Sequence, residues 1–125
     1  AYEQYGPQSV EHYRGMFAYA LWNRREKELF AVRDRLGIKP FYYYWDGEVF
    51  VFASEIKALL AHPAVPCRPA TSTFAEYLSF GYLDSARTMF ENIHALPPGH
   101  WLRLQLSGAT PRLHIEPYWD APAPL

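Results

Sequence analysis

The sequence of 125 residues has a single cysteine, almost no net charge and no long apolar run. One cysteine, Cys67, excludes an internal disulfide framework and a multi-cysteine metal site, and it favours a reducing, cytoplasmic setting. The five histidines lack the i, i+4 spacing of a helical metal site, so we predict no metal. No apolar segment approaches the roughly 20 residues needed to cross a bilayer. A formal net charge of -1 gives no electrostatic reason to expect nucleic acid or an anionic membrane as a partner.

Aromatic residues are abundant, at 18% of the chain, which favours a sheet-rich core. Residues 17–22 and 29–32 are predicted to form a first hairpin. The strand 17–22 carries almost no polar residue and should therefore be buried on both faces. A last hairpin is predicted for residues 100–106 and 112–115.

The clearest hairpin signal joins residues 41–45 to residues 49–53. Asp46 and Gly47 lie between these two runs, and an Asp-Gly dipeptide accepts the positive φ angles of a tight turn. This pattern predicts two adjacent antiparallel strands.

Helices are expected before and after these strands. Residues 1–14 have a helical pattern that Gly6 and Pro7 should interrupt. Residues 55–61 are predicted to form a short helix, with Ser54 as its N-terminal cap.

A longer helix is predicted to open at a capping box made by Thr73 and Glu76 and to stop before Gly81. The order is then helix, four strands, two helices and two strands, which indicates an α+β fold with antiparallel strands and flanking helices. Residues 117–125 carry three prolines and are interpreted as a linker.

Three segments resemble the class II glutamine amidotransferases in order and spacing. They are residues 14–22 (RGMFAYALW), 31–43 (AVRDRLGIKPFYY) and 52–60 (FASEIKALL).

The second half of the chain resembles one branch of that family, the glutamine-hydrolysing asparagine synthetases. Its segments are residues 77–82 (YLSFGY), 88–90 (TMF), 96–100 (LPPGH) and 118–120 (YWD). The resemblance covers essentially the whole chain.

The resemblance implies part of a four-layer αββα sandwich of the N-terminal-nucleophile hydrolase type. Residues 1–116 would be the C-terminal half of a glutaminase domain, and residues 117–125 a linker toward a missing synthetase domain. The intact enzyme would hydrolyse glutamine to glutamate and ammonia, and its synthetase domain would use ATP and Mg to convert aspartate to asparagine.

By the same resemblance, the nucleophile is a cysteine at the mature N-terminus, activated by its own amino group. Residue 1 here is alanine, and Cys67 lies mid-chain, where a loop or packing role is expected. The glutamine-binding segments of the family would precede residue 1. We therefore expect the chain alone to be inactive, with no catalytic, substrate-binding or cofactor-binding residue of its own.

Arg33, Asp34 and Lys39 form a charged loop between two predicted strands. One interpretation is that this loop faces the synthetase domain or supports the glutaminase site from outside. The other is a local Arg-Asp pair, with Gly37 and Pro40 shaping the bend.

Met16 and Ile38 suggest a further role. In this family ammonia crosses between the two sites through an apolar channel, and these two residues could line its entrance. Apolar walls suit neutral ammonia, since burying an unpaired ammonium is costly. Ordinary core packing is the alternative.

Two other functions remain open at this stage. The chain could belong to a relative that amidates another carboxylate, such as a β-lactam synthetase or a polysaccharide-modifying amidotransferase. It could also be a glutaminase-like interaction module without catalysis.

Overall fold

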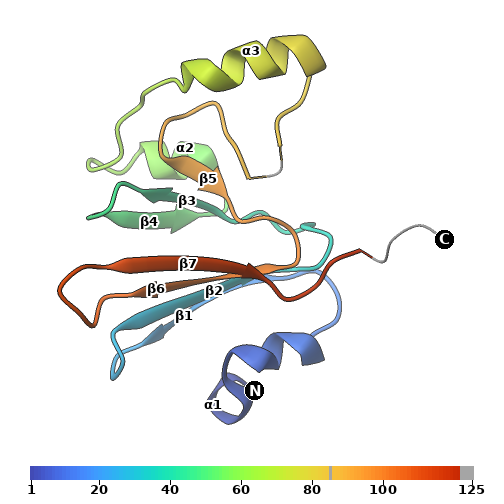
Figure 1. Cartoon of the computed structure of the whole chain (residues 1–125), viewed down its shortest axis with the longest axis vertical. Coiled ribbons are helices and arrows are strands. Elements are labelled where there is room, and N and C mark those ends of the chain that lie inside the picture. Colours follow the sequence, from blue (N-terminus) through green and yellow to red (C-terminus); the bar gives the residue numbers. More distant parts are fainter. Residues whose placement is uncertain (85, 122–125) are drawn as a thin grey trace. The chain divides into compact units, whose positions relative to one another are not determined.

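The computed structural model describes residues 1–84 and 86–121, and the chain divides into two compact units. Unit 1 consists of Ala1–Lys39 and of the chain from Pro98 onward, and unit 2 consists of Pro40–Pro97. Each unit has its own antiparallel sheet and its own helices (Figure 1). The predicted α+β class, with antiparallel strands and flanking helices, is thus confirmed for the described residues.

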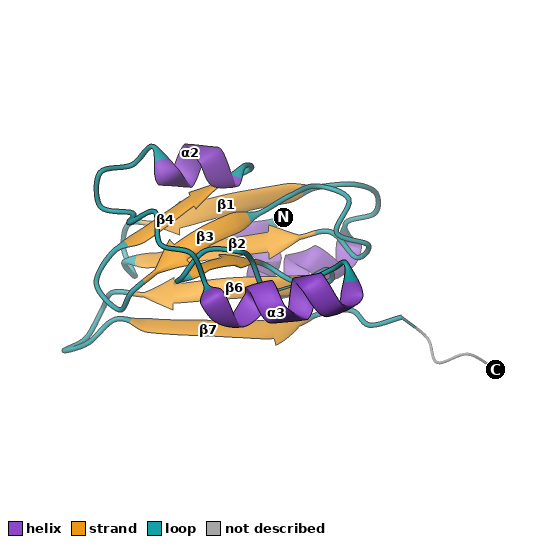
Figure 2. Cartoon of the chain, turned by 90° about the horizontal axis from the view of Figure 1, so that it is seen from above, coloured by secondary structure: helices purple, strands orange, loops and turns teal. Residues whose placement is uncertain are grey.

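The sheet of unit 1 has four strands in the order β1-β2-β6-β7. Their bounds are Ala18–Asn23, Glu28–Arg33, His100–Gln105 and Arg112–Pro117. Both hairpins predicted here are confirmed, and β6 and β7 run side by side in Figure 2. The pairing of β2 with β6 joins the two hairpins, although the whole of unit 2 separates them in the sequence.

Strand β1 lies at the edge of this sheet, so the expectation that residues 17–22 are buried on both faces is wrong. The side chains of Leu21 and Trp22 are 38% and 48% exposed. The buried strand is β2, in which Phe30 and Val32 are 1% exposed or less. Both strands are apolar, and only the distant partner β6 decides which of them takes the inner position.

The first residues form α-helix α1 (Tyr2–Tyr5) and 3₁₀ helix η1 (Gly6–His12). Gly6 has φ 59, which breaks the helical stretch at the predicted place. Val10 of η1 packs against Phe30, so this segment covers one face of the sheet of unit 1.

The sheet of unit 2 has three strands in the order β4-β3-β5. Their bounds are Tyr42–Trp45 for β3, Phe50–Ala53 for β4 and Ile93–Ala95 for β5. Sequence analysis missed β5, because three residues are too short to show an alternating pattern. It forms by pairing with β3, where His94 lies opposite Tyr43.

The turn between β3 and β4 confirms the Asp-Gly prediction. Gly47 has φ 101, and the Asp46 carboxylate accepts the backbone N–H groups of Glu48 and Val49 at 2.9 and 2.8 Å. These donors come first among the causes that hold the pKa of Asp46 below its ordinary value, so the carboxylate stays charged and keeps the turn closed.

The two helices of unit 2 are α2 (Ile56–Leu60) and α3 (Thr71–Phe80). The cap predicted at Ser54 is wrong, because Glu55 occupies the N-cap position of α2 and makes no capping hydrogen bond with its side chain. Helix α3 ends as predicted at Gly81, which has φ 75.

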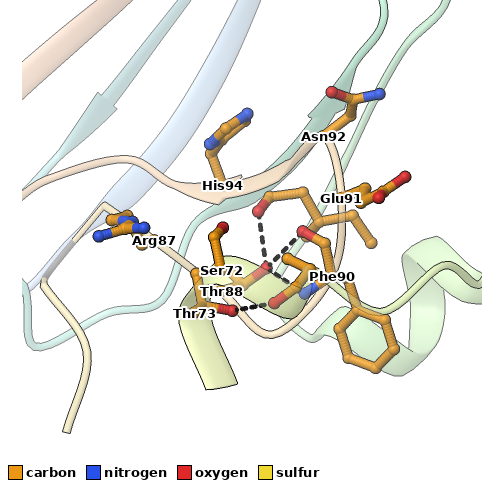
Figure 3. A pocket seen from close by; sticks show the side chains of 10 residues that line it. Ser72, Thr73, Arg87, Thr88, Phe90, Glu91, Asn92 and His94 are labelled. Atoms are coloured by element: carbon orange, nitrogen blue, oxygen red, sulfur yellow. Dashed lines mark hydrogen bonds between the residues drawn. The ribbon is translucent and has the colours of Figure 1, made fainter. Parts of the chain in front are cut away.

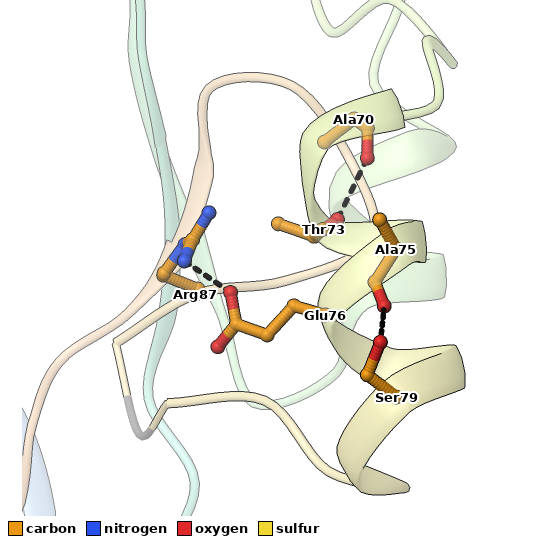
Figure 4. A network of polar contacts seen from close by, with 6 residues as sticks. All are labelled: Ala70, Thr73, Ala75, Glu76, Ser79 and Arg87. Carbon is orange, nitrogen blue, oxygen red and sulfur yellow. Dashed lines mark hydrogen bonds and ion pairs between the residues drawn. The ribbon is translucent and has the colours of Figure 1, made fainter.

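The capping box predicted for α3 is also wrong, because the helix begins two residues before Thr73. The N–H of Ala70 donates to Met89 O and fixes that earlier start. Thr73 therefore lies inside the helix and donates its hydroxyl to Ala70 O at 2.7 Å, while Glu76 pairs with Arg87 (Figure 4).

None of the helices in the described part of the chain has the length and apolarity that crossing a membrane requires.

The core of unit 2 is small and lies between α2 and its sheet. Its buried members are Tyr44, Leu59, Val65 and Ile93. Leu59 is 0% exposed, whereas Leu78 of α3 is 82% exposed. The two helices thus offer one buried and one exposed leucine for comparison.

We predict that Leu59→Ala lowers the free energy of unfolding by roughly 2 to 5 kcal/mol, because it removes apolar contacts and leaves a cavity. Leu78→Ala is the matched control, since it makes the same change in a helix at an exposed position. It should cost no more than about 0.5 kcal/mol. Urea unfolding of both variants measures the difference, and equal losses would contradict this account of the core.

Candidate functional site

The loop after β2 is organised by one buried carboxylate. Asp34 is 1% exposed. Its Oδ1 accepts the N–H groups of Leu36 and Ile38 at 3.2 and 3.0 Å, and its Oδ2 accepts the N–H of Lys39 at 2.9 Å. Three backbone N–H groups within residues 36–39 are therefore held by a single side chain.

The charge of Asp34 is maintained in this buried place. Burial raises the pKa of its carboxyl. Hydrogen bonds to the backbone at Lys39, Ile38, Leu36 and Phe17 lower the pKa by more than burial raises it, so the pKa lies below its ordinary value. Asp34 is therefore ionised at neutral pH. Its oxygens bind the loop backbone and are poorly suited to proton transfer near neutral pH.

Arg33 binds the same loop from its carbonyl side. Its Nε donates to Lys39 O and its Nη2 to Gly37 O, both at 2.8 Å. The guanidinium thus satisfies C=O groups, while the Asp34 carboxylate satisfies N–H groups of the same segment. The backbone of Lys39 takes part in both sets of contacts, and its side chain is exposed. The structure therefore brings the three predicted charged residues together, and their domain-facing role stays a prediction.

A second segment, Pro98 and Gly99, closes on this loop. The N–H of Gly99 donates to Asp34 O at 2.9 Å. Gly37 has φ 65 and no room for a side chain, because a Cβ there would lie 2.7 Å from Pro98 Cγ. Gly99 has φ 67, and a Cβ there would lie 2.5 Å from the backbone oxygen of Trp119. Both positions therefore require glycine.

A third segment follows β7. The hydroxyl of Tyr118 donates to Arg33 O at 2.9 Å, and the N–H groups of Tyr118 and Trp119 donate to Gly99 O at 2.8 and 3.2 Å. Burial first, and then the negative charge of Asp34, raise the pKa of Tyr118 to about 12, so its hydroxyl remains a donor. We call the hydrogen bonds that join Arg33 and Asp34 to Gly99, Tyr118 and Trp119 the clamp.

The clamp includes the first residues of the segment interpreted as a linker. Pro117 is the last residue of β7, and residues 118 and 119 are hydrogen-bonded to Gly99. Residues 122–125 lie outside the described residues. The linker toward a further domain stays a prediction.

Three exposed apolar side chains belong to this site, two of them on the loop after β2 and the third, Met16, just before β1. Met16, Leu36 and Ile38 are 63%, 70% and 54% exposed, and we call them the apolar rim. Together with Asp34 and Trp119 they contribute to the lining of a pocket of about 290 Å³. Core packing, the alternative interpretation of Met16 and Ile38, does not describe side chains that are more than half exposed. Their role in a channel stays a prediction.

Sequence analysis missed Leu36, Gly99 and Tyr118 as members of this site. The signal was available, because all three lie within the segments that carry the family resemblance. What local sequence could not show is that these distant segments meet.

A second pocket of about 290 Å³ lies in unit 2, between the start of α3 and residues 87–94. Thr88 lies at its centre and donates its hydroxyl to Ile93 O at 2.7 Å (Figure 3). Arg87 lines this pocket and is paired with Glu76. The hydrogen bonds of Thr73 and Thr88 and the ion pair of Arg87 thus connect parts of unit 2 to each other.

The remaining candidates give no further site. Cys67 is free and exposed, as expected for a loop cysteine. Within residues 1–84 and 86–121 no group of three or more His, Cys, Asp or Glu side chains could hold a metal ion.

We predict that Asp34→Asn lowers the free energy of unfolding at pH 7 by about 1.5 to 3 kcal/mol, the value of a hydrogen bond to a charged group. The pKa of Asp34 is lower in the folded chain than the unfolded value of about 3.9. The stability that the Asp34 carboxylate contributes to the folded chain is therefore fully present above the unfolded pKa. It is lost as the pH falls through the folded pKa. The gap between wild type and variant should therefore narrow below about pH 4.

Denaturant unfolding between pH 2 and 7 measures this gap, and Asp120→Asn, which changes an exposed carboxylate, is the control. A gap for Asp34→Asn that stays constant over the acid range would contradict the role of its charge.

We also predict that Gly99→Ala lowers the free energy of unfolding by at least about 2 kcal/mol, through the strain of φ 67 and the contact with Trp119 O. Gly108→Ala is the control, because its Cβ would meet nothing nearer than Thr110 O at 3.8 Å. It should change stability by no more than about 0.5 kcal/mol. Similar thermal midpoints for the two variants would show that the clamp tolerates a side chain at residue 99.

A family model described as a glutamine amidotransferase domain matches residues 1–119. The chain is 38% identical over 121 residues to glutamine-hydrolysing asparagine synthetase 3 of Bacillus subtilis. The matched region covers 96% of this chain and 19% of that protein.

Two further relatives have similar coverage. The chain is 32% identical over 123 residues to the putative glutamine-hydrolysing asparagine synthetase 2 of Methanocaldococcus jannaschii, with 97% of this chain and 24% of that protein covered. It is 35% identical over 123 residues to amidase chyE of Penicillium rubens, with 98% and 17% covered. The chain thus spans about a fifth of the length of these relatives, and it belongs to the glutamine amidotransferase domain family.

Proposed function

We propose that this chain is part of the glutaminase domain of a larger, ATP-dependent asparagine synthetase. The parent enzyme would hydrolyse glutamine to glutamate and ammonia and use the ammonia to convert aspartate to asparagine. The observation that carries the proposal is the family match over residues 1–119, together with 38% identity to a glutamine-hydrolysing asparagine synthetase over 96% of the chain.

Within the parent, this chain would supply scaffold and an interface. The family nucleophile is an N-terminal cysteine, and the only cysteine of these 125 residues is Cys67, an exposed loop residue. We therefore expect the 125 residues alone to be inactive. The charged loop with Arg33, Asp34 and Lys39 would face the synthetase domain and hold its own shape through the clamp.

ATP and Mg would bind in the synthetase part of the parent and supply the adenylation of aspartate there. The described residues of this chain do not fit either group, because they offer no cluster of metal-binding side chains. The sequence also has no Gly-rich phosphate loop. We place the parent in the cytoplasm, on the single cysteine of this chain.

The apolar rim would form the wall that ammonia passes on leaving the glutaminase site. Met16, Leu36 and Ile38 offer no hydrogen-bonding side chain, so neutral ammonia loses little by passing them, whereas ammonium would lose its hydration without a partner. Asp34 beside them is already ionised and occupied by backbone N–H groups. It would therefore neither protonate the ammonia nor offer free oxygens to ammonium.

A second candidate function is amidation of a carboxylate other than aspartate. The observation that favours it is the 35% identity to amidase chyE, which nearly equals the identity to the synthetases over the same length. A β-lactam synthetase-like or polysaccharide-modifying enzyme would fall in this group. A non-catalytic interaction module is the third candidate.

The test uses the full-length protein that contains this chain, with ¹⁵N-amide-labelled glutamine, ATP, Mg and aspartate. Labelled asparagine supports the proposal. Hydrolysis of glutamine with no asparagine formed, either from glutamine or in a second assay from free ammonia, would favour the second candidate. No hydrolysis of glutamine by the full-length protein would favour the interaction module.

For the rim we predict that Met16→Lys in the full-length enzyme lowers glutamine-dependent synthesis while ammonia-dependent synthesis persists, because a long charged side chain on the apolar path would obstruct neutral ammonia. Met16→Leu is the matched control, since it keeps an apolar side chain of similar volume, and it should leave both activities close to wild type. Unchanged hydrolysis and unchanged glutamine-dependent synthesis in Met16→Lys would overturn the channel role.

A further inference from the structure

We propose that Tyr118 is a positioning residue, whose hydroxyl holds the apolar rim in the shape that carries ammonia. It would act through the Arg33 carbonyl and the loop behind it, without touching substrate. This inference rests on the proposed function, and it adds that the segment after β7 controls how much of the released ammonia is delivered.

A chain of hydrogen bonds connects Tyr118 to the loop that carries Leu36 and Ile38. The Tyr118 hydroxyl donates to Arg33 O at 2.9 Å. The Arg33 side chain in turn binds Gly37 O and Lys39 O, on either side of Ile38. A displacement of Arg33 would therefore shift the two hydrogen bonds that hold the backbone on either side of Ile38.

Tyr118 is itself anchored by backbone hydrogen bonds. Its N–H and that of Trp119 both donate to Gly99 O, while the N–H of Gly99 donates to Asp34 O. The Trp119 side chain is half-buried and lines the rim pocket with Leu36. The segment after β7 thus binds the backbone at Arg33, where β2 ends, and lines the rim pocket together with Leu36.

One hydrogen bond from the Tyr118 hydroxyl can matter for the position of this loop. Residues 34–39 form neither helix nor strand, so the position of the rim depends on a few side-chain contacts. Removing one ordinary hydrogen bond changes a local equilibrium about fivefold, which loosens a loop without unfolding a domain. Tyr118 has no role as a proton carrier in this account, because its hydroxyl remains protonated at neutral pH.

The test is Tyr118→Phe in the full-length enzyme, which removes the hydroxyl and keeps the ring. The matched control is Tyr44→Phe, because Tyr44 of unit 2 also donates one hydroxyl hydrogen bond, to Asp46 at 2.9 Å, and is 3% exposed. Three readouts are compared: glutamine hydrolysis, ammonia-dependent synthesis, and the fraction of labelled amide nitrogen that reaches asparagine.

We expect Tyr118→Phe to keep glutamine hydrolysis and ammonia-dependent synthesis within about twofold of wild type. The leaked fraction, which is the labelled nitrogen that does not reach asparagine, should rise about fivefold, in line with one lost hydrogen bond. Tyr44→Phe should leave the leaked fraction unchanged. Hydrogen exchange at the amides of Leu36, Ile38 and Lys39 should also become faster in Tyr118→Phe alone.

The proposal is overturned if the leaked fraction in Tyr118→Phe equals that of wild type, or if Tyr44→Phe raises the leaked fraction by the same factor. Failure of the proposed function is a separate outcome, since wild type itself would then transfer no label to asparagine. If Tyr118→Phe does not yield folded protein, Tyr118→Met is measured in the same way, because it also removes the hydroxyl that donates to Arg33 O and replaces the ring with a flexible apolar side chain. An unchanged leak in that variant likewise overturns the proposal.

Discussion

The buried carboxylate of Asp34 is the interaction on which the candidate site depends. It collects three backbone N–H groups from the five residues that follow it, so that a segment without helix or strand takes a single shape. A buried charge is costly unless it is fully hydrogen-bonded, and these donors meet that condition. The same contacts keep the pKa low, which removes Asp34 from acid-base chemistry and leaves it a structural anion.

The clamp joins parts of the chain that are far apart in sequence. Gly99 is its centre, because its N–H binds Asp34 O and its carbonyl receives two N–H groups from the segment after β7. Only a residue without a side chain allows this approach, since Trp119 O would lie 2.5 Å from a Cβ. The antiparallel pairing of β2 with β6 delivers Asp34 and Gly99 to the same end of the sheet, so the fold of unit 1 creates the site.

The sequence predicted several features that local chemistry decides, although the caps that it predicted at Ser54 and Thr73 are wrong. The Asp46-Gly47 turn, the break at Gly6 and the stop at Gly81 each depend on one or two residues, and all three are present. It failed where distant partners decide. Strand β5 exists only by pairing with β3, and β1 lies at the edge only because β2 pairs with β6.

The candidate site shows the same division. The charged and apolar residues of the site were identified from the sequence, with a local Arg-Asp pair as one interpretation of the charged loop and a role toward the synthetase domain or the glutaminase site as the other. In the structure the side chains of Arg33 and Asp34 bind the loop backbone, and the Tyr118 hydroxyl binds Arg33 O across 85 positions of sequence. Family resemblance named the right segments, whereas their meeting depends on the topology of the sheet.

The exposure of the apolar rim supports the proposed setting of this chain. Met16, Leu36 and Ile38 lie more than half in solvent, although the loop that carries two of them is held by charged hydrogen bonds. A rigid apolar surface gains stability only when something covers it. Such a surface is therefore more consistent with a wall inside a larger enzyme than with a free face, and the rigidity supplied by Asp34 and Tyr118 is what a wall between two reaction sites requires.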